Sequence, residues 1–170
     1  RSPYDVMNTQ DIANLPVGDI ADKDCVLFLW ATYPKLEDAL AVVKGWGFRF
    51  KTVAFTWVKL NPSGKGYHFG LGYWTRQGTE LCLLATRGKP KRVNNSIANL
   101  VIAPRGEHSS KPKEVRDRIV QLMGPLPRVE LFARGMGKID NGWVNAGLEI
   151  DGQDIRVALE QIKDDTYLLR

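Results

Sequence analysis

Apolar residues form several short, nearly unbroken runs along the chain. Residues 25–32 (CVLFLWAT) and 81–85 (LCLLA) show no alternation of apolar with polar positions. A run of this length is typical of a strand that is buried on both faces of a sheet. We expect strands at residues 25–32, 49–59, 81–85, 100–103, 128–133 and 143–150.

Other apolar residues recur at the three- and four-residue spacing of a helix. Residues 34–46 and 112–124 show this pattern most strongly. A short helix is expected to begin near Asn8 or Thr9, which favour the N-cap position, and a last helix is expected at residues 153–162. The expected core positions of the two stronger helices are Leu36, Leu40, Val43, Val115, Ile119, Leu122 and Met123.

Buried strands that alternate with amphipathic helices predict an α/β fold with a mostly parallel central sheet and helices on both faces. The 170 residues fit a single domain. Sheets of this kind bind ligands at the carboxyl ends of their strands. The residues that follow the expected strands are therefore candidates for a site: 30–32, 57–59, 105–111 and 134–137.

The loop at residues 105–111 (RGEHSSK) is rich in functional side chains. It places a cation, a carboxylate, an imidazole and two hydroxyls directly before the helix that Pro112 opens. The N-terminus of a helix favours anionic groups, and Lys111 strengthens that preference. A plain capping loop needs only one of the two serines, so the pattern favours a ligand site over a cap.

A second candidate is residues 72–90 (GYWTRQGTELCLLATRGKP), which join an aromatic loop to a buried strand. Tyr73 and Trp74 offer flat faces that can stack on nucleobases, and Arg76 can bind a phosphate. The alternative, more common for aromatic side chains, is a hairpin that caps the core. The preceding glycine-rich residues 61–72 predict a loop and match neither the P-loop nor the dinucleotide-binding fingerprint.

The basic residues are unevenly distributed. The formal net charge is +5, but fifteen Lys or Arg and only four Asp or Glu lie between residues 44 and 118. A basic centre with acidic flanks is compatible with a surface that faces phosphates, and equally with an ordinary solvated face.

The cysteines, the histidines and the lengths of the apolar stretches bear on three questions: whether the chain has a disulfide, a metal site or a membrane-spanning helix. Cys25 and Cys82 both fall in apolar runs, which predicts buried free thiols in a reducing compartment rather than a disulfide. His68 and His108 are far apart in sequence, so no zinc or other metal is expected. No apolar stretch approaches the length of a membrane-spanning helix, so no membrane association is expected.

Seven sequence motifs occur together in a recognisable order: YDVMNTQDI, VLFLWAT, WGF, TWVK, GYWTRQGTELCLLATRGKP, EHSSKPKEV and VELFAR. In this order and spacing the chain resembles the β-class N(6)-adenine methyltransferase family over residues 3–149. That family is typified by the catalytic subunit of the messenger-RNA adenosine methyltransferase. The resemblance implies a Rossmann-like methyltransferase fold, S-adenosylmethionine as cofactor, and methyl transfer to the exocyclic amine of adenine.

The resemblance also implies residue roles. The family's D-P-P-W motif, which carries the catalytic groups, is expected upstream of Arg1. Substrate-binding roles fall on Tyr4, Trp57, Lys59 and Glu80, with Glu80 as the carboxylate that reads the target base. Cofactor-binding roles fall on Ser109, Lys111, Glu130, Arg134 and Glu149, with Lys111 at the methionine carboxylate.

The short loop at 61–72 and the TRGKP sequence resemble the bacterial and phage branch, which implies DNA as the substrate and a cytoplasmic location in a bacterial or phage-infected cell. RNA is the alternative substrate.

A catalytically silent, nucleic-acid-binding subunit of a methyltransferase heterodimer is another alternative, because Leu148 stands where the family often has Asn. The sequence is compatible with a homodimer or a heterodimer. A Rossmann-like oxidoreductase is disfavoured by the absent glycine fingerprint.

Overall fold

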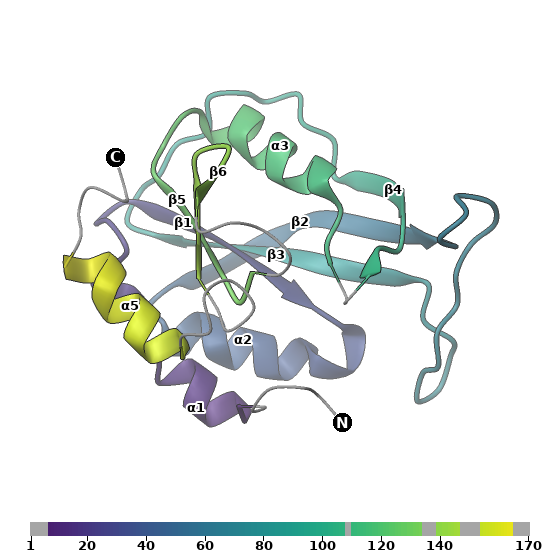
Figure 1. The fold of residues 1–170 in the computed structure, drawn as a ribbon, viewed down its shortest axis with the longest axis horizontal. Helices are drawn as coiled ribbons and strands as arrows, with labels where there is room; N and C mark the ends of the chain where they lie inside the picture. The colour runs from purple at the N-terminus through teal and green to yellow at the C-terminus, as the bar shows by residue number, and fades with distance from the viewer. Residues whose placement is uncertain (1–6, 108–109, 134–138, 147–153, 165–170) are drawn as a thin grey trace.

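The computed structural model describes residues 7–107, 110–133, 139–146 and 154–164. In this part of the chain, seven strands form a four-stranded sheet in the order β1-β3-β2-β4 and a three-stranded sheet in the order β5-β7-β6 (Figure 1). The strands of the first sheet are β1 (Cys25–Ala31), β2 (Arg49–Leu60), β3 (Thr79–Arg87) and β4 (Leu100–Pro104). Those of the second are β5 (Arg128–Leu131), β6 (Ile139–Asp140) and β7 (Trp143–Ala146).

The first sheet is mixed, so the prediction of a mostly parallel sheet is wrong. β3 runs antiparallel to both of its neighbours, β1 and β2, and β4 runs parallel to β2. The reason lies in the connection between β2 and β3. Residues 61–78 contain no helix that could carry the chain across the sheet, so the chain reverses through them as a long hairpin. The second sheet is mixed too, because β5 is parallel and β6 antiparallel to β7.

Helices cover both faces of the first sheet, as predicted (Figure 1). On one face, α2 (Leu36–Gly45) packs together with α1 (Thr9–Ala13) and α5 (Ile155–Asp164). On the other face lies α3 (Lys113–Met123). Two short 3-10 helices, Val17–Asp19 and Tyr33–Lys35, complete the described elements.

The apolar run in β3 arises from burial on both faces rather than from parallel pairing. Cys82 packs in the core cluster on the α3 side, whereas Leu83 and Ala85 pack on the α2 side. All three side chains are buried. Because β3 is an inner strand with helices over both faces, its residues are apolar whichever way the neighbouring strands run.

The N-terminal helix begins where its sequence predicts. The side chain of Asn8 caps α1 by accepting a hydrogen bond from the backbone N–H of Asp11 at 2.8 Å. The strand expected at 128–133 is shorter than predicted, because Phe132 has a φ of 58° and turns the chain after Leu131. The strand expected at 143–150 is described only as β7, and its remainder lies outside the described residues.

Of the seven expected core positions on the helices, Val43, Val115 and Ile119 are buried, and Leu36, Leu122 and Met123 are partly buried. Leu40 is an exception, because it is exposed while Ala39 and Val42 of α2 are buried. The α3 helix buries Val115 and Ile119 as predicted, and it also buries a charged residue between them, Arg116.

Both cysteines are free thiols, as predicted, but only Cys82 is buried, whereas Cys25 at the start of β1 is partly buried. Burial, followed by the nearby carboxylate of Glu80, raises the pKa of Cys82 to about 12, so this thiol stays protonated and packs as an apolar side chain. Within the described ranges, no helix combines the length and the apolar composition needed to cross a membrane.

Candidate active site

The side chain of Glu80 is a buried carboxylate held by two lysines. It lies near the beginning of β3 and is 4% exposed. Its Oε1 is 3.0 Å from Nζ of Lys59, and its Oε2 is 2.5 Å from Nζ of Lys111. We call these three residues the Glu80 cluster. Each carboxylate oxygen is therefore engaged by a different ammonium group, so the two lysines hold the carboxylate from both of its oxygens.

Two tryptophans stand beside the lysines of the Glu80 cluster. The rings of Trp30 and Trp57 meet edge to face, with centroids 6.0 Å apart and an interplanar angle of 73°. The ammonium of Lys59 lies 5.0 Å from the ring centroid of Trp57, and that of Lys111 lies 5.3 Å from the ring centroid of Trp30. These cation–π contacts restrict both lysines, in addition to their ion pairs with Glu80.

The mixed topology explains why these residues meet. Trp30 lies at the end of β1, and Trp57 and Lys59 lie at the end of β2. Because β3 is antiparallel to both strands, its beginning, with Glu80, falls at the same edge. Lys111 reaches this edge from the loop that follows β4, the strand parallel to β2. The Glu80 cluster thus lies where β1, β2 and β4 end and where β3, which runs in the opposite direction, begins.

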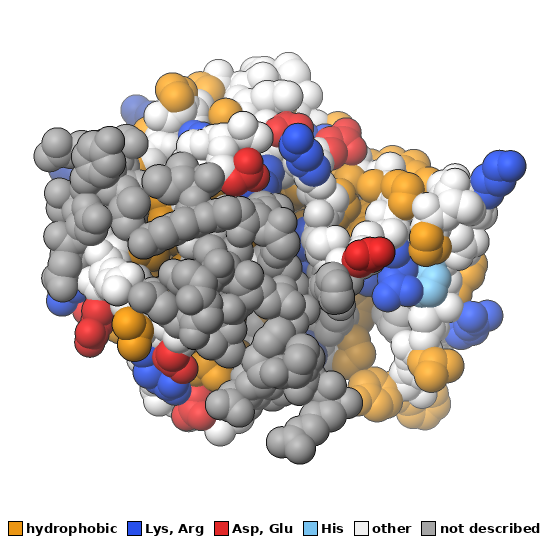
Figure 2. Space-filling model, in the orientation of Figure 1, with side chains coloured by type: hydrophobic (Ala, Val, Ile, Leu, Met, Phe, Trp, Pro, Cys, Tyr) orange, Lys and Arg blue, Asp and Glu red, His pale blue; other side chains and the backbone are white. Residues whose placement is uncertain are grey.

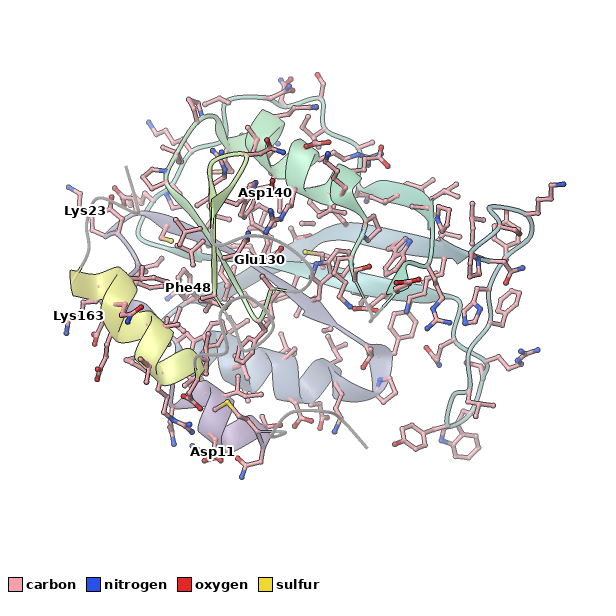
Figure 3. The ribbon with its side chains drawn as sticks, viewed as in Figure 1. Asp11, Lys23, Phe48, Glu130, Asp140 and Lys163 are labelled. Carbon is pink, nitrogen blue, oxygen red and sulfur yellow. The ribbon has the colours of Figure 1, made fainter. Side chains whose placement is uncertain are left out.

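A second cluster of charges lies under α3. The guanidinium of Arg116 donates from Nε to Oε1 of Glu130 at 3.2 Å and pairs through a terminal nitrogen with Oε2 at 3.1 Å. It also pairs with Oδ2 of Asp140 at 3.4 Å and donates to Oδ1 of Asn145. We call these four residues the Arg116 cluster, and Figure 3 labels its two acids, Glu130 from β5 and Asp140 from β6.

The guanidinium of the Arg116 cluster packs against an aromatic ring. Trp143 of β7 is buried, with the guanidinium carbon of Arg116 4.7 Å from its ring centroid and that of Arg128 at 5.5 Å. Arg116 thus joins α3 to all three strands of the second sheet. Sequence reasoning missed it, although a signal was present: Arg116 directly follows core residue Val115 and is three residues before core residue Ile119 on the same helix.

The structure brings together four of the predicted site residues: Trp57, Lys59, Glu80 and Lys111. Glu130, predicted to contact the cofactor, belongs instead to the Arg116 cluster, and its cofactor role stays a prediction. The other predicted site residues, Tyr4, Ser109, Arg134 and Glu149, lie outside the described residues. Among the described residues, no group of three or more His, Cys, Asp or Glu side chains could hold a metal ion.

The aromatic loop after β2 differs from a core-capping hairpin. Tyr73 is 85% exposed and Trp74 is 99% exposed, so neither packs on the core. At the base of this loop, Arg105 contacts Nε2 of His68 at 3.1 Å. Partial desolvation, followed by the positive charges of Arg105, Lys59 and Arg76, lowers the pKa of His68, so its ring is neutral at pH 7.

The fold and the site together define an α/β protein with a charged, tryptophan-lined site at the ends of its central strands. The family model named MT-A70 matches residues 1–149, and the chain belongs to this family. The prediction drawn from the seven motifs is thereby confirmed.

Individual relatives agree with this assignment. The chain is 35% identical over 159 residues to the "Type II methyltransferase M.MunI" of a Mycoplasma species, covering 91% of this chain and 63% of that protein. It is 30% identical to an "N(6)-adenosine-methyltransferase MT-A70-like protein" of Drosophila melanogaster, covering 88% of this chain and 24% of that protein. It is 28% identical to the human "N(6)-adenosine-methyltransferase catalytic subunit METTL3", covering 88% of this chain and 26% of that protein. The chain therefore spans less than two thirds of the length of these relatives.

Proposed function

We propose that the protein transfers a methyl group from S-adenosylmethionine to the exocyclic amine of adenine in DNA. The observation that carries this proposal is the Glu80 cluster beside its two tryptophans, in a chain of the MT-A70 family. DNA is favoured over RNA because identity is higher to the Type II methyltransferase, at 35%, than to the two adenosine methyltransferases, at 30% and 28%. On this proposal the protein acts in the cytoplasm of a bacterial or phage-infected cell.

Glu80 has the properties needed to recognise an amino group. Its two oxygens offer about four acceptor positions, and each oxygen has one lysine partner. A carboxylate that remains ionised can accept a hydrogen bond from the exocyclic amine of an adenine that has left the base stack.

The described residues can also accommodate the cofactor. S-adenosylmethionine supplies an electrophilic methyl group on a sulfonium, together with a carboxylate and ribose hydroxyls. Lys111 has three donors and is 32% exposed, and one of its donors engages Glu80, so it can bind the cofactor carboxylate as well. Glu130 is 33% exposed, and its carboxylate has about four acceptor positions, of which the described contacts with Arg116 use two. Ser109, Arg134 and Glu149 complete the proposed contacts.

The test is transfer of labelled methyl groups from S-adenosylmethionine to single-stranded DNA, duplex DNA and RNA by the natural polypeptide. We expect label in adenine of DNA, and none in a strand of equal length that lacks adenine. Label in RNA alone would move the proposal to an RNA adenine methyltransferase, which the 28–30% identity to adenosine methyltransferases supports as the second candidate. Oligonucleotide binding without any label would indicate a catalytically silent subunit.

A further inference from the structure

Residues 61–78 form an arm that projects beyond the first sheet between β2 and β3 (Figure 1). Backbone pairing gives this arm a defined shape. Gly70 and Gln77 exchange hydrogen bonds of 2.8 and 3.2 Å, and Leu60 forms an antiparallel bridge with Tyr67. The arm therefore contains two turns, the first at residues 61–66 and the second at residues 71–76, which we call the tip.

The tip exposes large apolar side chains that contribute nothing to the core. Tyr73, Trp74 and, beside them, Leu71 are almost completely accessible, with Leu71 at 95%. Leaving side chains of this size in water is unfavourable by about 1.5–3 kcal/mol each relative to burial. Exposed apolar groups gathered on one structural element mark an interaction surface more often than isolated ones do.

The charge of the arm is positive. It carries Lys65 and Arg76, and its sequence contains no Asp or Glu. Arg76 is fixed near the tip by a 2.8 Å hydrogen bond to the backbone oxygen of Phe69 and by a cation–π contact with the Phe69 ring. At the base, Arg105 adds a further cation. Figure 2 shows orange and blue side chains and the pale blue histidine together at this end of the molecule, with one red acidic side chain beside them.

The arm is connected directly to the Glu80 cluster. It begins directly after Leu60, the residue that follows Lys59, and its last residues lead through Thr79 into Glu80. The backbone of Lys59 bonds to two segments of the arm. Its carbonyl oxygen accepts a hydrogen bond from the N–H of His68 at 2.8 Å, and its N–H donates to the carbonyl oxygen of Gly78 at 2.9 Å. A molecule that reaches the Glu80 cluster from this side therefore passes the arm.

We propose that the arm binds the nucleic-acid strand next to the target adenine, with bases stacked on Tyr73 and Trp74 and phosphates near Lys65 and Arg76. Flat aromatic faces combined with cations fit an unstacked strand, because every base has a π-face and every linkage a negative charge. The absence of acidic side chains from the arm sequence favours a polyanion over a mixed-charge protein surface. This inference rests on the proposed function.

The first experiment compares three substitutions at the tip of the natural polypeptide. Trp74→Leu and Tyr73→Leu remove a π-face but keep an apolar side chain, and each should weaken binding of a fluorescent single-stranded 12-mer about tenfold, the value of one base–aromatic stack. The matched control is Leu71→Ser, which removes an equally exposed apolar side chain without a π-face and should leave the affinity unchanged. Equal losses in all three variants would overturn base stacking.

The salt dependence of binding and the length of the nucleic-acid substrate provide two further measurements. Lys65→Gln should reduce the slope of log affinity against log salt by about one, as for one lost phosphate contact. Methyl transfer to a trinucleotide with a central adenine, too short to reach the tip, should be the same for Trp74→Leu and the natural sequence. With a 12-mer as substrate, Trp74→Leu should raise KM about tenfold.

The outcomes separate this inference from the proposed function. If the natural sequence transfers methyl groups but the tip variants bind the 12-mer equally well, the arm inference fails and the function stands. If binding depends on Trp74 but no transfer occurs, the function fails and the arm inference stands. If the tip variants change the oligomeric state in sedimentation without changing nucleic-acid affinity, the arm is a protein interface and the inference is overturned.

Discussion

The two charged clusters have opposite compositions. In the Glu80 cluster, two cations surround one carboxylate, whereas in the Arg116 cluster one cation holds two carboxylates and an amide. The first cluster has an excess of positive charge and uses lysines, which are flexible point charges with spare donors. The second uses the rigid fork of a guanidinium and joins four secondary-structure elements. The first is therefore suited to exchange partners with a ligand, and the second to hold the fold.

The largest expected effect concerns Glu80. Glu80→Gln keeps the shape of the side chain but removes its charge, so the amine of adenine loses a charge-assisted hydrogen bond. The value of kcat/KM for methyl transfer should fall about a hundredfold, or about 2.7 kcal/mol. Binding of S-adenosylmethionine, measured by calorimetry, should change much less.

The matched control for Glu80 is Glu114→Gln, which makes the same change at an exposed acid of α3 paired only at the surface with Arg118. It should leave kcat/KM unchanged. Equal losses of transfer and cofactor binding in Glu80→Gln would contradict a role in reading the base.

The next effect concerns stability rather than transfer. Arg116→Met leaves the carboxylates of Glu130 and Asp140 without their cation. Because these acids are 33% and 41% exposed, water offsets part of the loss. The free energy of unfolding in urea should fall by about 2–3 kcal/mol. Lys113→Met, the same replacement of a cation at an exposed position of α3, should change it by less than about 0.5 kcal/mol. Equal effects would show that the Arg116 cluster does not hold the second sheet.

A smaller effect distinguishes the two lysines of the Glu80 cluster. Lys111→Met should raise the Kd for S-adenosylmethionine about tenfold, because one charge-assisted contact to the cofactor carboxylate is lost. Lys59→Met removes the other lysine, 3.0 Å from the same carboxylate, and should leave this Kd unchanged. If calorimetry gives the same Kd for both variants, Lys111 has no separate role at the cofactor.

These two clusters also show how far the sequence can be interpreted. Most elements were predictable from periodicity, and the core residues Cys82 and Val115 from their apolar neighbours. Strand direction was not, because an inner antiparallel strand such as β3 has the same apolar composition as a parallel one. Glu80 was identified through the family resemblance, since its lysine partners are 21 and 31 residues away in sequence. Arg116 was missed because its partners belong to strands that α3 meets only in the folded chain.

The smallest expected effect is the pH dependence of binding at the base of the arm. In the folded protein, partial desolvation and then the positive charges of Arg105, Lys59 and Arg76 lower the pKa of His68, so the ring is neutral at pH 7. Protonation is therefore easier in the unfolded chain, and the contribution of His68 to stability is present above its unfolded pKa and is lost as the pH falls through its lowered folded pKa. Nucleic-acid phosphates have the opposite influence, because they favour the charged ring. Affinity for a 12-mer should rise roughly twofold as the pH falls from about 7 to 5.5. His68→Gln, which cannot gain this charge, should abolish the rise in anisotropy titrations, and an unchanged pH profile in that variant would place the titrating group elsewhere.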